Sequence, residues 1–151
     1  MVTLNAISQH DLTASERESV LAHAVELHLL GSDEADHEGF DIAEEKGSNV
    51  THLLRITRDG QPAGIMYLLP FADLPGHYEM TILIHPEFRG RHLTAEAVSL
   101  LENFVRTSVA GARGLCATVR EHNPLRAELT EFLLRHGYRY VPQQLAFIKT
   151  L

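Results

Sequence analysis

The chain has 151 residues, which suits a single domain over residues 1–151 with a sizeable hydrophobic core. Hydrophobic residues make up 44% and charged residues 22%, as in ordinary globular proteins, and no apolar run approaches the roughly 18–20 residues that span a bilayer. A formal net charge of −7 disfavours a nucleic-acid-binding protein, and a single cysteine, Cys116, excludes an internal disulfide and fits a reducing compartment.

The N-terminal third combines a strand, a helix and an acidic stretch. Residues Val2–Ile7 alternate well enough for an edge strand, and Thr13-Ala14-Ser15-Glu16 has the pattern of a capping box, which predicts a helix to about Leu30. Between residues 33 and 45 lie seven of the twenty carboxylates. We interpret them as a solvated connector or, alternatively, as an acidic rim that attracts a cationic substrate. The N-terminus lacks a secretory signal, so we expect a cytoplasmic protein without a membrane anchor.

Three strands are predicted in the middle of the chain. Thr51–Thr57 and Ala63–Leu69 flank Asp59-Gly60, a dipeptide typical of two-residue hairpin turns. After a loop rich in proline and glycine, His77–Ile84 is the third strand. A helix is then expected from about Thr94 to Val109, and its apolar face is predicted to consist of Ala97, Leu100, Leu101, Phe104 and Val105.

The C-terminal third adds strands around one more helix. Leu115–Val119 is a short apolar strand, and the segment before it is long enough for a parallel crossover from the third strand. Asn123-Pro124 is a strong helix start, with Asn123 as N-cap. A buried stripe is expected at Leu125, Leu129, Phe132 and Leu133, and a closing pair of strands at Tyr138–Val141 and Leu145–Lys149. The order β-α-β-β-β-α-β-α-β-β predicts an α/β fold whose mixed, mostly antiparallel sheet has one parallel crossover and flanking helices.

The loop between the third strand and the following helix is the most informative stretch. It carries Arg89-Gly90-Arg91 directly before the helix start. A strand, a short loop and a helix start together present free backbone N–H groups to a phosphate, and arginines add the charge that a pyrophosphate favours. The pattern therefore predicts a phosphorylated cofactor at this loop.

The element order and the motif Ile84-x-Pro86-x-x-Arg89-Gly90-Arg91, with Asn123 and Gly137-Tyr138 near the end, resemble the GCN5-related N-acetyltransferase (GNAT) superfamily over nearly the whole chain. The resemblance implies acetyl-CoA as cofactor, with its pantetheine arm along the third strand and its pyrophosphate at the loop. By resemblance, the cofactor-binding residues are Ile82, Leu83, Ile84, Arg89, Gly90, Arg91, His92, Leu93, Thr94 and Asn123.

The loop departs from the family pattern Arg/Gln-x-x-Gly-x-Gly/Ala at both small positions. His92 stands at the first and Thr94 at the second. Glycine lets a backbone approach a phosphate without an intervening Cβ. The side chain of His92 would turn outward, contact the phosphate when protonated, or block the site.

Glu79 is the first candidate for a general base, because it lies on the third strand, where many acetyltransferases similar to this chain have a glutamate. A surface carboxylate or an arginine partner is the alternative. Leu133 occupies the place of the tyrosine that often protonates the leaving thiolate in the superfamily, so either the thiolate leaves unaided or another group donates the proton. Core packing or burial on a sheet face is the favoured role of Tyr138 and Tyr140, and Cys116 is interpreted as a small buried hydrophobic residue. His122 is a candidate auxiliary base.

The leading hypothesis is an acetyl-CoA-dependent N-acetyltransferase that transfers an acetyl group directly to a primary amine of a small cationic molecule or a peptide. The alternative is a catalytically weak or inactive acetyltransferase-fold protein that binds CoA or a partner protein, as His92, Thr94 and Leu133 suggest. No metal site, nucleic-acid partner or membrane partner is expected, and most of the ten histidines are interpreted as surface or loop residues. The apolar C-terminal strands allow pairing across a homodimer.

Overall fold

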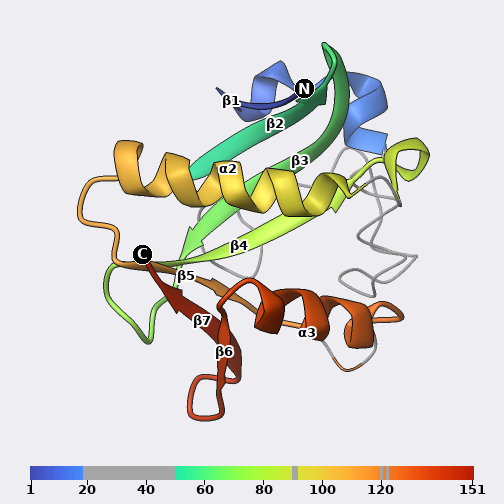
Figure 1. Ribbon diagram of the computed structural model, residues 1–151. Coiled ribbons are helices and arrows are strands. Elements are labelled where there is room, and N and C mark those ends of the chain that lie inside the picture. The colour runs from blue at the N-terminus through green and yellow to red at the C-terminus, as the bar shows by residue number, and fades with distance from the viewer. Residues whose placement is uncertain (19–49, 90–91, 120, 122) are drawn as a thin grey trace.

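A computed structural model describes residues 1–18, 50–89, 92–119, 121 and 123–151. These residues form a seven-stranded sheet in the order β1-β2-β3-β4-β5-β7-β6 (Figure 1). Its strands are β1 (Val2–Ile7), β2 (His52–Arg58), β3 (Gln61–Pro70), β4 (His77–Ile84), β5 (Gly114–Ala117), β6 (Arg139–Val141) and β7 (Ala146–Thr150). The acidic stretch, His122 and most of the first predicted helix lie outside the described residues.

All neighbouring strands pair antiparallel except β4 and β5, which are parallel and joined through helix α2 (Leu93–Ser108). This arrangement confirms the predicted fold class and the single parallel crossover. The hairpin between β2 and β3 is also confirmed, since Asp59 and Gly60 both have positive φ angles, 51° and 81°, as a two-residue turn of this kind requires. In the part of the chain that the structure describes, no helix is long and apolar enough to span a membrane.

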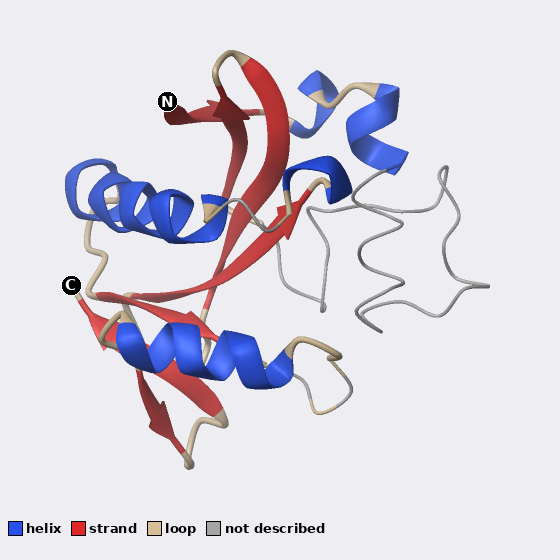
Figure 2. Cartoon of the chain, turned by 45° about the vertical axis from the view of Figure 1, so that its right-hand side comes forward, coloured by secondary structure: helices blue, strands red, loops and turns tan. Residues whose placement is uncertain are grey.

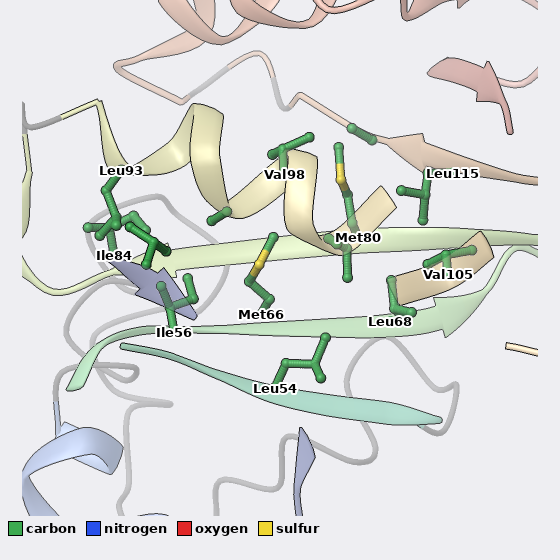
Figure 3. Close-up of a cluster of buried hydrophobic side chains, with 14 of the residues drawn as sticks. Leu54, Ile56, Met66, Leu68, Met80, Ile84, Leu93, Val98, Val105 and Leu115 are labelled. Carbon is green, nitrogen blue, oxygen red and sulfur yellow. The ribbon is translucent and has the colours of Figure 1, made fainter. Parts of the chain in front are cut away.

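The main hydrophobic core lies between one face of the sheet and the helices α2 and α3 (Arg126–Arg135) (Figures 1 and 2). Figure 3 shows Leu54, Met66 and Met80 of three neighbouring strands directed toward α2. Each contributes a side chain at least 93% buried. Because this face of four strands is apolar, the crossover helix that returns over it must present a continuous apolar stripe.

That stripe differs from the predicted one at two positions. In α2 the buried apolar residues are Leu93, Ala97, Val98, Leu101 and Val105, and the predicted Leu100 is 36% exposed. The second differing position is Phe104, which is only partly buried against the core, and Leu93 and Val98 complete the buried stripe. Leu125 was predicted in the second stripe but is 44% exposed, since α3 begins only at Arg126 and Leu125 lies in the preceding turn.

The opposite face of the sheet holds a smaller core of Leu53, Ile65, Tyr67, Leu69 and Leu83. The N-terminal segment docks there through one ion pair. Arg55 of β2 donates two hydrogen bonds of 2.7 Å to the carboxylate of Glu16, which is 2% exposed, and one of 2.8 Å to the carbonyl of Asp11. Glu16 also completes the predicted capping box, which is confirmed by reciprocal 3.0 Å bonds with Thr13.

Burial raises the pKa of Glu16, but the hydrogen bonds from Arg55 and Thr13 outweigh burial and hold the pKa below its usual value of 4.5. A carboxylate with a lowered folded-state pKa stabilises the protein above its unfolded-state pKa, and this contribution is lost as the pH falls through the folded-state pKa.

We therefore expect the free energy of unfolding to fall with acidification below about pH 4.5. Urea unfolding at a series of pH values measures it. In Glu16→Gln this pH dependence should be shallower, because the variant lacks the carboxylate that titrates. An equally steep decline in the variant would show that other groups dominate.

Candidate functional site

The central feature of the site is a split in the sheet between β4 and β5. β4 pairs with β3 from Tyr78 to Ile84, but its register with β5 covers only His77, Tyr78 and Glu79. Beyond the pair formed by Glu79 and Cys116, which we call the apex, no described strand pairs with the β5-facing edge of β4. Backbone N–H and C=O groups along Met80–Ile84 on that edge can therefore bind an extended ligand, as a strand edge binds a peptide.

All three predicted strand residues of the cofactor site lie along this edge. Ile82 packs against the main core on the α2 side, whereas Leu83 belongs to the smaller core on the other face and is 2% exposed. Ile84, at 8% exposed, also points into the main core. Their side chains pack on the two faces of the sheet, and the backbone of this stretch offers its hydrogen-bonding groups along the edge.

A short connection carries the chain from the end of β4 to the start of α2. It contains the 3₁₀ turn η3 (Pro86–Phe88), in which Phe88 is 8% exposed and anchors the turn in the main core. Arg89 follows, half-buried, and Leu93 fixes the first turn of α2 with 2% exposure. Gly90 and Arg91 lie outside the described residues. Phe88 and Leu93 thus fix the N-terminus of α2 at the end of the split.

His92, the departure from the family pattern, adopts the conformation that glycine favours. It is the N-cap of α2 with φ 56° and ψ 19°, in the left-handed region, and its exposed side chain makes no capping hydrogen bond. The first backbone N–H groups of α2, including that of the half-buried Thr94, have no partner within the helix and carry its positive dipole. The backbone geometry suited to an anion is therefore kept although a side chain is present.

His85 lies in the loop after β4, and it is buried rather than at the surface. It directly follows β4, is 6% exposed, and its Nε2 atom has no hydrogen-bond partner among the described residues. Its backbone N–H donates to the carbonyl of Ala63 at 2.8 Å, which extends the β3–β4 ladder by one bond. The strand end thus carries an unsatisfied polar atom, which is costly unless a ligand or water binds it.

Glu79 and Cys116 lie directly opposite each other at the apex, on the sheet face away from α2. Cys116 is fully buried, and burial, followed by the charge of Glu79, raises the pKa of its thiol to about 12. The thiol is thus protonated near neutral pH, which confirms the packing role and disfavours an acyl-cysteine. Glu79 is half-buried, so its side chain at the apex has access to solvent.

Two tyrosines and Leu133 lie near the end of the chain. Leu133, at the place of the family tyrosine, is 4% exposed and packs in the main core. Tyr138 is 1% exposed, and burial, then the charge of Glu102 and the 2.9 Å bond to it, raises the pKa of Tyr138 far above its usual value. Tyr140 is 48% exposed and packs against the ring of Phe147, so its predicted burial is wrong.

Asn123 organises the chain before α3 but is not its N-cap. Its side-chain oxygen accepts the N–H of Leu125 at 2.8 Å, and its carbonyl accepts the N–H of Arg126 at 3.0 Å. The N-cap is Leu125, two residues later than predicted, because Asn123 and Pro124 form a separate turn before the first helical residue. Among the described residues, no three His, Cys, Asp or Glu side chains gather as a metal site.

The sequence pattern of the acetyltransferase (GNAT) family matches residues 16–138, so this chain belongs to that family of acetyltransferases. No curated protein sequence matches the chain significantly.

Solved structures of acetyltransferases share the fold. An acetyltransferase from Thermus thermophilus is 19% identical with a TM-score of 0.61, over 99% of this chain and 97% of that one. A GNAT family acetyltransferase from Brucella melitensis in complex with acetyl-CoA is 18% identical with a TM-score of 0.62, over 100% and 88%. Aminoglycoside acetyltransferase AAC(6')-Ib in complex with ribostamycin and coenzyme A is 15% identical with a TM-score of 0.71, over 99% and 93%.

The left-handed backbone at His92 leads to a stability prediction. A side chain in this conformation costs about 1–2 kcal/mol relative to glycine, and more when it is β-branched. We expect His92→Val to unfold at lower urea concentration than the wild type, and His92→Gly to be at least as stable as the wild type.

The matched control is Leu145, an exposed residue with φ 53° in the β6–β7 turn, away from the split. Leu145→Val and Leu145→Gly should follow the same order of stability. If His92→Val matched His92→Gly in urea unfolding while the Leu145 pair differed, the left-handed cap would be wrong.

Proposed function

We propose that this protein is an acetyl-CoA-dependent N-acetyltransferase that transfers an acetyl group directly to a primary amine. The observation that carries the proposal is the split, whose unpaired β4 edge leads to the N-terminus of an α-helix capped in the left-handed conformation. Membership of the acetyltransferase (GNAT) family supplies the reaction class. The solved relatives in complex with coenzyme A or acetyl-CoA support the choice of cofactor.

The residues at the split fit the chemistry of coenzyme A. The β4 edge at Met80–Ile84 offers alternating backbone donors and acceptors to the two amides of an extended pantetheine arm. The N-terminus of α2 and the guanidinium of Arg89 suit a diphosphate. His85 Nε2 adds one unsatisfied polar atom at the same strand end. When bound, acetyl-CoA supplies a thioester whose acetyl carbon bonds to the amine nitrogen as the C–S bond breaks.

Glu79 is proposed as the general base. An ammonium ion is not a nucleophile, so the carboxylate accepts one proton from the amine and passes it to solvent, to which this half-buried residue has access. No protein acid is assigned to the thiolate, because a thiol of pKa about 8–9 leaves without one. Leu133 offers no proton, and Tyr138 already donates its hydroxyl proton to Glu102. Most of the acceleration then comes from holding the two reactants together.

The acceptor is proposed to be a primary amine on a small cationic molecule, with a peptide amine as the other class. The seven carboxylates between residues 33 and 45 support a cationic acceptor through electrostatic attraction. AAC(6')-Ib, whose complex with ribostamycin shares the fold, is an example of an aminoglycoside acetyltransferase. A homodimer through the C-terminal strands remains a prediction from the sequence.

A catalytically weak protein that binds coenzyme A is the second candidate. The observation that favours it is His92, whose side chain stands at the helix N-terminus where the family pattern has a small residue. It predicts binding of acetyl-CoA without release of free thiol in the presence of any amine.

Thermal unfolding with and without acetyl-CoA tests the proposal, together with thiol release in the presence of an amine panel. Wild type should be stabilised by acetyl-CoA at millimolar concentration, because a ligand that binds only the folded state raises Tm. Glu79→Gln should keep this stabilisation and lose about 10²–10⁴-fold in kcat, since it removes a general base and no cofactor contact.

Arg89→Ala is the opposite control, because it should lose the stabilisation by acetyl-CoA while the fold persists. Stabilisation of the wild type without thiol release would favour the second candidate. If acetyl-CoA did not stabilise the wild type, the proposed acetyl-CoA-dependent activity would be contradicted. If Glu79→Gln kept full turnover, Glu79 would not be the general base.

A further inference from the structure

A polar cluster around the buried carboxylate of Glu102 ties α2 to the C-terminal elements, with the Lys149 side chain 25% exposed. Glu102 of α2 is 8% exposed and accepts hydrogen bonds from Lys149 Nζ at 3.0 and 3.1 Å and from the Tyr138 hydroxyl at 2.9 Å. Lys149 of β7 also donates to the carbonyl of His136, directly after α3, at 2.9 Å. We call Glu102, Tyr138, Lys149 and this carbonyl the clamp.

The hydrogen bonds of the clamp are complete. An ammonium has three N–H donors, and Lys149 reaches both carboxylate oxygens and one carbonyl. The ammonium also lies 5.6 Å from the ring centroid of Tyr138. Gly137, with φ 90°, turns the chain so that the residues on either side of it meet the same lysine. The hydrogen bonds therefore constrain both the distances and the relative orientation of the groups in the clamp.

The clamp lies beside the apex and joins the two sides of the split. We call β4 with α2 the β4 arm, and β5 with β7 the β5 arm. α2 continues from β4, whereas Lys149 pairs with Leu115 of β5, and Leu115 pairs in turn with Tyr78 of β4 (Figure 1). Lys149 is thus one residue away from the register position where β4 and β5 part. The main core also spans both arms, but its individual contacts are not directional, whereas the hydrogen bonds of the clamp are.

We propose that the clamp sets the angle between the β4 arm and the β5 arm, and so holds the split at the width that an acyl-CoA arm requires. The inference rests on the proposed function. Glu102, Lys149 and Tyr138 are positioning residues, because they act on the split through α2, β7 and the residue after α3. Loosening the clamp should weaken acetyl-CoA binding and expose the apex.

Cys116 serves as a built-in reporter of the apex, because it is the only cysteine and is 0% exposed. The measurement is the rate of its reaction with 4,4′-dithiodipyridine in the protein without ligand. Lys149→Met should react about tenfold faster than wild type and bind acetyl-CoA about tenfold more weakly by calorimetry, as expected for the loss of a charge-assisted bond. Lys149→Arg, which keeps the cation, should restore most of both values.

Thr13→Ala is the matched control, because it removes the cap of the first helix and lowers stability far from the clamp. Rates are compared at the same temperature interval below each Tm. If Lys149→Met reacted no faster than Thr13→Ala, the clamp would contribute stability alone and the proposal would be overturned. If Lys149→Met did not fold, Tyr138→Phe, which removes only one bond, should show the same two effects in smaller measure.

The two proposals fail in different ways. Absence of acetyl-CoA binding in the wild type overturns the proposed function. Normal acetyl-CoA binding in a folded Lys149→Met variant overturns the role of the clamp and leaves the proposed function standing.

Discussion

Parallel pairing between β4 and β5 ends at Glu79 and Cys116, and the backbone of β4 beyond this pair keeps hydrogen-bonding groups that no described strand on the β5 side satisfies. An unpaired strand edge of this kind is available to a ligand that completes its hydrogen bonds. The fold places three useful features around the same edge: a carboxylate at the apex, an unsatisfied histidine nitrogen at the strand end, and an α-helix N-terminus just beyond. The reaction that we propose follows from this one interruption of the sheet.

The rest of the molecule holds the split in place. β2, β3 and β4 pair antiparallel along most of their length and form a rigid platform under α2. The other arm is tied to this platform by the apolar core and by the Glu102–Lys149 ion pair. The Glu102 side chain is 10% exposed and the Lys149 side chain 25%, so removal of the lysine leaves a largely buried carboxylate without its cation, which is destabilising. A charged pair at this position is a costly choice for stability alone, which fits a role in positioning.

Local signals in the sequence predicted much of the fold. The capping box at Thr13, the Asp59-Gly60 turn and the strand His77–Ile84 are confirmed, and each depends on residues close together in the chain. The predicted start of α3 was wrong because Asn123 forms a separate turn before the helix. The burial of Glu102 could not be predicted, since its partner Lys149 is 47 residues away and only the folded sheet brings them together.

The candidate site was predictable in outline and not in its key detail. The sequence located the loop and the strand before it, and it marked His92 as a departure from the family pattern. Only the structure shows that His92 has a left-handed backbone, the conformation that glycine favours, and that Ile82 and Ile84 pack on one face of the sheet while Leu83 packs on the other.

Hydrogen–deuterium exchange of the backbone amides of β4, with and without acetyl-CoA, tests the central claim most directly. The account predicts slower exchange along Met80–Ile84 and in the first turn of α2 when acetyl-CoA is present, with no change in β1. Stabilisation of the protein by acetyl-CoA with unchanged exchange at these residues would place the cofactor elsewhere and contradict the account.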